Sequence, residues 1–142
     1  MASRKETRTG LTVPGLSIKD GHKVAKVPQG RLHALNDLQF RLKHAHWNVV
    51  GRDFIVVHEL LDPQIEQVRA MVDGTAERVA ALGASPTGLQ VAFVRVRAWD
   101  DYSIGRAGTA EHLGALNLVQ DGEIASHRSA RAKGSGTTAW TA

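Results

Sequence analysis

The sequence predicts an all-α protein with one domain. Apolar residues recur at the three- and four-residue spacing of an amphipathic helix in three stretches, 28–47, 54–82 and 103–127. Gly51 and Gly83 follow the first two stretches, where glycine commonly ends a helix. A chain of 142 residues is long enough for one sizeable core.

Composition narrows the possible functions. The chain has no cysteine, which excludes disulfides and thiolate metal sites. No apolar run approaches the roughly 18 residues that a membrane span needs, and no signal peptide pattern is visible, so we expect no membrane partner. The net charge of +4 is a weak indication of a polyanionic partner such as DNA.

Residues 1–27 are expected to form a basic, extended N-terminal tail. Arg4, Lys5 and Arg8 carry its first positive charges, and no apolar periodicity accompanies them. Two interpretations remain open: a basic arm that contacts DNA phosphates, or a solvated terminus.

The first helix is expected from Pro28 to about Trp47, because proline is tolerated in a first turn but costs about 3 kcal/mol inside a helix. His46 lies at the end of its apolar stripe. A lone histidine there is more often a buried core residue than a metal ligand. Trp47 is expected in the core.

The second helix is expected from Phe54 to about Leu82, and it carries an informative set of side chains. At about 100° per residue, His58, Asp62, Asp73 and Glu77 fall within roughly 100° of one helix face. They form two pairs that span about 28 Å along the axis, at 1.5 Å per residue. One ion therefore cannot contact both pairs on one straight helix.

A dimer would remove this obstacle. Positions 58 and 77 share the midpoint 67.5 with positions 62 and 73. Two antiparallel copies related by a two-fold axis near Gln67 would set His58 and Asp62 beside Glu77 and Asp73 of the second copy. Imidazole and carboxylate together suit iron, zinc or manganese.

Structural interpretations of the same residues remain open. Asp62 followed by Pro63 is also a standard helix start, and Asp73 and Glu77 also fit a solvated face. Glu59 points about 100° away from the stripe and is excluded. Glu66 and Arg69 are expected to form a helix salt bridge or an interface pair.

The third long helix is expected from Ser103 to about His127, capped by Asp100 or Asp101 and preceded by a short helix or strand. The residues expected to face inward are Val91, Phe93, Val94, Ile104, Leu113, Leu116, Val119 and Ile124. Four glycines between 105 and 122 would together cost a few kcal/mol relative to alanine.

Residues 126–142 are expected to form a second basic tail of low order. Arg128, Arg131 and Lys133 are its cations, and they are a second candidate for DNA contact. The abrupt change of composition also suggests a truncated or frameshifted product.

The runs KHAHWNVVGRDFIVVHELLD and VDGTAER resemble the Dps family, the DNA-binding mini-ferritins of starved bacteria. This resemblance implies a ferritin-like up-down helical bundle subunit over residues 28–125, here with the fourth helix (helix D) missing. It implies a dodecameric shell and iron sites shared by two-fold-related subunits. The matching ligand positions are His46, His58, Asp62, Asp73 and Glu77, and Trp47 is expected near the iron.

The resemblance implies a ferroxidase, a metal-oxidising enzyme that oxidises Fe(II) with H2O2 or O2, stores the ferric product and protects DNA without sequence preference. A cytoplasmic, nucleoid-associated location follows from it. The alternative is a non-enzymatic DNA-binding or degenerate Dps-like fragment that cannot close a shell. A bundle that holds zinc or manganese without redox chemistry has the same ligands.

Overall fold

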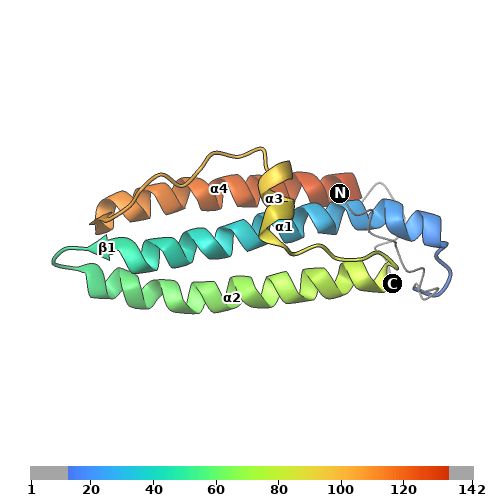
Figure 1. Cartoon of the computed structure of the whole chain (residues 1–142), viewed down its shortest axis with the longest axis horizontal. Coiled ribbons are helices and arrows are strands. Elements are labelled where there is room, and N and C mark those ends of the chain that lie inside the picture. Colours follow the sequence, from blue (N-terminus) through green and yellow to red (C-terminus); the bar gives the residue numbers. More distant parts are fainter. Residues whose placement is uncertain (1–12, 135–142) are drawn as a thin grey trace.

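The computed structural model describes residues 13–134. Three long helices, α1 (Ile18–Asn48), α2 (Phe54–Ala81) and α4 (Thr109–Gly134), are accompanied by a short one, α3 (Gln90–Val96). They lie side by side with α1 in the middle (Figure 1). The segment that contains α3 returns along the bundle, so that α4 runs in the same direction as α2 and opposite to α1 (Figure 1). The predicted all-α helical bundle is confirmed.

Two very short strands join the helix ends. β1 (Val49–Val50) directly follows α1, and β2 (Ala107–Gly108) directly precedes α4. The strands are parallel, with Val49 opposite Ala107. They hold the end of α1 to the start of α4.

The prediction that the first helix begins at Pro28 is wrong. α1 begins ten residues earlier, at Ile18, where the Ser17 side chain accepts a hydrogen bond from the Asp20 backbone amide (3.1 Å). Pro28 lies inside the helix and is buried. The burial of Pro28, with Ala25 and Leu32 on the same side, offsets the hydrogen bond that proline removes.

The pairing of α1 with α2 supplies most of the core. Its main cluster consists of Leu35, Leu38, Leu42, Ala45, Val49, Val57, Leu61, Ile65, Val68 and Leu116. At the far end of the pair, a Cβ on Gly21 would lie 2.3 Å from the carbonyl oxygen of Leu82. α1 therefore touches the end of α2 at a place where only glycine fits. The second helix itself agrees with its predicted bounds, and Gly83 has a φ of 80° where it ends.

α4 begins later than predicted, at Thr109 instead of Ser103. Residues 103–106 are not helical: β2, which follows them, pairs with β1, and His44 Nε2 donates to the Ile104 carbonyl oxygen (2.8 Å). The cap is not Asp100 or Asp101. Glu111 instead accepts a hydrogen bond from the Gly108 amide (3.0 Å), which is half of a capping box.

α4 also continues beyond His127, so the expectation of low order over residues 126–134 is wrong. The half-buried residues in this part of α4 recur at helical spacing, and they are Glu123, Ser126, His127 and Ala130. Because most of them are polar, a search for apolar periodicity does not detect this stripe. Among the residues predicted to face inward, Leu116 and Phe93 are buried and Val119 is partly buried. The prediction is wrong for four others, which are exposed: Val91, Val94, Leu113 and Ile124.

A groove of about 950 Å³ separates α4 from α2 at the end of the bundle where α4 ends. Its apolar floor includes Val24, Val27 and Leu35 of α1. Residues 13–134 hold no further long helix above this groove. None of the helices over these residues has both the length and the apolar character that crossing a bilayer requires.

Candidate metal centre

Three of the five predicted ligands meet at the end of the α1–α2 pair. His46 comes from the last turn of α1, and His58 and Asp62 lie one turn apart on α2. One ligand atom from each of them lies within 4.8 Å of the others. α2 continues through Pro63, so Asp62 is not the N-cap of a helix. Two imidazoles and a carboxylate at this spacing suit a divalent transition metal.

A backbone hydrogen bond orients His58. Its Nδ1 lies 3.0 Å from the carbonyl oxygen of His46. A carbonyl oxygen can only accept, so Nδ1 donates, and Nε2 is the ring nitrogen left for a metal ion. Metal-binding histidines are commonly fixed in this way by a hydrogen bond from the other ring nitrogen.

His46 is buried, and its imidazole makes no well-formed hydrogen bond with the described residues. Its residue is 7% exposed, and among the described residues neither ring nitrogen has a partner with hydrogen-bond geometry. Its ring stacks on that of His58 with centroids 3.6 Å apart, and Nε2 lies 3.0 Å from Asp62 Oδ1. Because buried ring nitrogens without a well-formed hydrogen bond are costly, a metal ion shared by His46 and Asp62 would satisfy this imidazole.

Asp62 forms an ion pair with Lys43, which is not among the predicted site residues. Lys43 Nζ lies 3.2 Å from the same Oδ1 of Asp62. This ammonium group is the main cause that lowers the pKa of the Asp62 carboxyl, so the carboxylate is ionised at neutral pH. Lys43 lies three residues before His46, one turn earlier on the same helix face, and that spacing was the signal available in the sequence.

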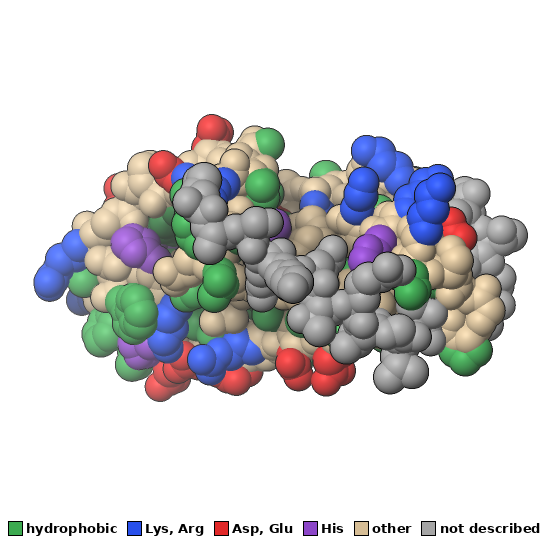
Figure 2. Space-filling view, turned by 45° about the vertical axis from the view of Figure 1, so that its right-hand side comes forward, with side chains coloured by type: hydrophobic (Ala, Val, Ile, Leu, Met, Phe, Trp, Pro, Cys, Tyr) green, Lys and Arg blue, Asp and Glu red, His purple; other side chains and the backbone are tan. Residues whose placement is uncertain are grey.

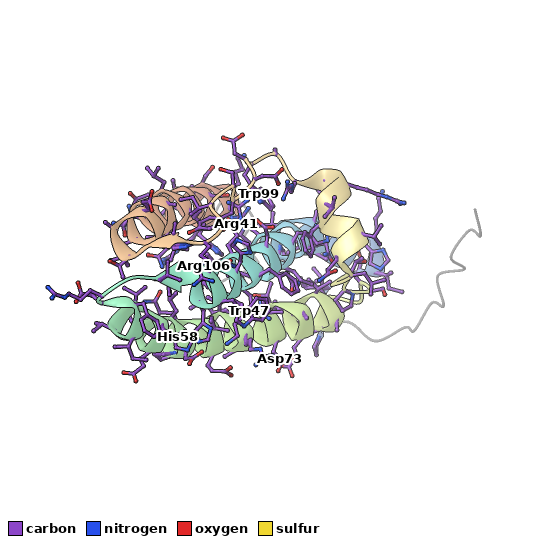
Figure 3. The ribbon with its side chains drawn as sticks, turned by 60° about the vertical axis from the view of Figure 1, so that its left-hand side comes forward. Arg41, Trp47, His58, Asp73, Trp99 and Arg106 are labelled. Carbon is purple, nitrogen blue, oxygen red and sulfur yellow. The ribbon has the colours of Figure 1, made fainter. Side chains whose placement is uncertain are left out.

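Asp73 and Glu77 do not join this cluster within one chain. Figure 3 shows His58 and Asp73 at separate places along α2. Both Asp73 and Glu77 are exposed, and Glu59 is exposed and stays outside the cluster as predicted. The two-fold arrangement that would unite the two groups stays a prediction.

The prediction that Trp47 is in the core is wrong. Its side chain is 70% exposed in this chain, although it directly follows His46 (Figure 3). A tryptophan this exposed is unusual on a free surface and common at protein interfaces.

The candidate DNA-binding residues that the structure describes lie at the opposite end of the bundle from the cluster (Figure 1). Arg128, Arg131 and Lys133 are exposed on the last turns of α4. Figure 2 shows Lys and Arg side chains gathered at that end of the molecule, and acidic side chains along the edge formed by α2. Arg4, Lys5 and Arg8 lie outside the described residues.

Comparisons with known proteins agree with this geometry. The Ferritin family model, described as a ferritin-like domain, matches residues 29–118. The DNA protection during starvation protein of Mycolicibacterium smegmatis is 52% identical over 116 residues, which cover 82% of this chain and 63% of that protein.

Two solved structures share the fold. Mycobacterium smegmatis Dps in its tetragonal form has a TM-score of 0.83 at 50% identity, and the match covers 88% of this chain and 76% of that one. DpsA14 from Streptomyces coelicolor has a TM-score of 0.83 at 50% identity, with coverage of 91% and 76%.

The fold and the matched domain define a ferritin-like protein. Within that class the chain belongs to the Dps family. It spans 63% of the length of the curated relative from Mycolicibacterium smegmatis.

Proposed function

We propose that this protein is a ferroxidase that stores iron and protects DNA from oxidative damage. The observation that carries the proposal is the cluster of His46, His58 and Asp62, in which the buried imidazole of His46 lies beside the Asp62 carboxylate and makes no well-formed hydrogen bond. In this proposal the second copy of a two-fold dimer completes each site with Asp73 and Glu77. Dodecameric assembly would then enclose the oxidised iron.

The chemistry requires ligands that hold both oxidation states of iron. Two Fe(II) ions give two electrons to H2O2, which takes up two protons and leaves as two waters. O2 can serve as the oxidant instead, with four electrons and four protons per molecule. Imidazole nitrogen suits the ferrous ion and carboxylate oxygen suits the ferric ion, and three ligands from one chain leave positions open. Removing Fe(II) and peroxide together suppresses hydroxyl radical formation.

The names of the relatives support the link to DNA. The Mycolicibacterium relative is named for DNA protection during starvation. We therefore assign this chain to the cytoplasm beside the nucleoid, with sequence-independent DNA contact through basic residues. The exposed side chains of Arg128, Arg131 and Lys133 are the described candidates.

Removing two ligands tests the proposal. His58→Ala combined with Asp62→Ala is expected to abolish fast Fe(II) oxidation, measured by the ferric absorbance after mixing with H2O2 or O2. Glu59→Ala is the matched control, because Glu59 neighbours His58 but stays outside the cluster. Circular dichroism must show the same helix content for both variants. Unchanged oxidation in the double variant would rule out this site.

A second candidate function is DNA binding without enzymatic activity. It is favoured by the open groove beside α4 and by the basic side chains at the end of that helix. A monomer that retards DNA but does not oxidise Fe(II) would establish it. Metal analysis of the purified protein separates iron from zinc or manganese, which the same ligands also accept.

A further inference from the structure

The exposed face of α2 has an arrangement of charges that is complementary to itself. Position 66 and position 69 share the midpoint 67.5 with the two pairs of proposed ligands. At about 100° per residue, Glu66 and Arg69 also fall inside the face that His58, Asp62, Asp73 and Glu77 occupy. An antiparallel second copy would therefore bring opposite charges together beside the two-fold axis.

The two side chains are available for such a contact. Arg69 Nη1 lies 3.0 Å from Glu66 Oε1, and the side chains are 59% and 67% exposed. An exposed ion pair three residues apart on one helix contributes only about 0.5 kcal/mol. The Glu66–Arg69 pair therefore adds little to the stability of one chain. Its position beside the two-fold axis gives it a possible role in the dimer.

The rest of the face follows the same symmetry. Ile55, 46% exposed, shares the midpoint with Ala80, so that apolar side chains would meet at both ends of the contact. Asp62 would face Asp73 of the partner subunit, and this is the one like-charge pair among those considered. A bound cation would remove that repulsion, whereas Glu66 and Arg69 attract without one.

We propose that Glu66 and Arg69 form a four-charge network with the same residues of a second copy and thereby fix the register of the two-fold dimer. The inference rests on the proposed function for the position of the axis. In this register Glu66 contacts Arg69 of the partner subunit, and Arg69 contacts Glu66 of the partner subunit. The network surrounds the axis between the two metal centres.

The network also opposes wrong registers. A slip of three residues in one direction would place Glu66 against Glu66 of the partner subunit, and a slip in the other direction would place the two arginines together. Like charges placed together at an interface are unfavourable, so the pair excludes both alternatives. Only the correct register places His58 and Asp62 of one chain beside Asp73 and Glu77 of the partner subunit.

Two charge-reversed variants test the pairing. Glu66→Arg has two arginines at these positions, and Arg69→Glu has two glutamates. Each variant alone repels its own copy, and the intrachain pair is lost in both. A 1:1 mixture restores every contact between chains but none within a chain. We expect at least about a tenfold loss of dimer in each variant alone, and about nine-tenths of the dimers in the mixture to be mixed, by native mass spectrometry.

The control is a mixture of wild type with isotope-labelled wild type, in which about half of the dimers are mixed by random pairing. A charge-variant mixture that also pairs at random, or does not dimerise, would overturn the network. Ferroxidase activity is measured separately on the mixed dimer. Selective pairing without iron oxidation would leave the network intact and count against the proposed function instead.

Discussion

The two sides of α1 differ in how closely the neighbouring helix packs against them. On one side α2 packs closely against α1, and nine of the ten residues in the main core cluster come from α1, β1 and α2. On the other side α4 contributes only Leu116 to that cluster, while Leu118 is 76% exposed and Ile124 is 48% exposed. The candidate ligands His46, His58 and Asp62 all belong to the well-packed pair. The position of the candidate metal centre therefore depends on the contact between α1 and α2 and not on α4.

Truncation of a core leucine gives the largest expected difference between the two sides. Leu61→Ala removes a side chain that is 1% exposed at the α1–α2 contact and should lower the free energy of unfolding by about 2–5 kcal/mol. Leu118→Ala on α4 should change it by less than about 0.5 kcal/mol. Urea denaturation measures both. Equal losses would mean that another surface covers α4 in solution.

Substitution of one glycine in α1 and one in α4 should change the free energy of unfolding in opposite directions. Gly21→Ala should destabilise the chain by about 1–3 kcal/mol, because the new Cβ overlaps the Leu82 carbonyl oxygen. Gly114→Ala in α4 meets nothing within 4 Å and should stabilise by up to about 1 kcal/mol through helix propensity. Thermal melting followed by circular dichroism gives the sign of each effect. A stabilising Gly21→Ala would contradict the close helix contact.

Lys43 of α1 is expected to compete with a metal ion for the Asp62 carboxylate on α2. Lys43→Met keeps the apolar stem but removes the ammonium group that a cation must displace from Asp62. Since this solvent-screened ion pair is weak, Zn²⁺ should bind only a few times more tightly, by up to about fivefold. Calorimetric titration measures the Kd, with Lys26→Met, also exposed on α1, as the control. Weaker binding in Lys43→Met would show that Lys43 assists the metal.

The smallest effect is expected at the α1–α4 contact. Burial raises the pKa of Glu123, so its carboxylate is disfavoured in the folded state, and Arg31 only partly compensates. A raised pKa makes Glu123 favour folding below its ordinary value of 4.5, and this contribution is lost as pH rises through the folded-state pKa. Glu123→Gln should therefore be more stable than wild type at pH 7, by less than about 1 kcal/mol because solvent screens the group. Denaturation curves should converge towards pH 4; a constant difference would contradict this.

The same difference explains which features the sequence could predict. The extent of α2 follows from apolar periodicity, because this helix buries one continuous face and ends just before Gly83, and the stripe of candidate ligands follows from the spacing of its polar residues. The start of α1 was missed because tertiary packing outweighs the cost of Pro28. The end of α4 was missed because its contact stripe is made of Glu123, Ser126, His127 and Ala130. Trp47 was misplaced because an apolar side chain at a possible interface has the same sequence pattern as a core residue.

In the proposed dimer each metal centre combines ligands from two chains, and complementation between two inactive variants can establish this arrangement. One variant carries His58→Ala and Asp62→Ala, and the other carries Asp73→Ala and Glu77→Ala. Refolded together at equal amounts, half of the dimers are mixed, and each mixed dimer has one complete site out of two. Fe(II) oxidation by H2O2 should therefore return to about a quarter of the wild-type rate, although each variant alone is inactive. A mixture that stays inactive, or an Asp73→Ala and Glu77→Ala variant that keeps full activity alone, would contradict the shared site.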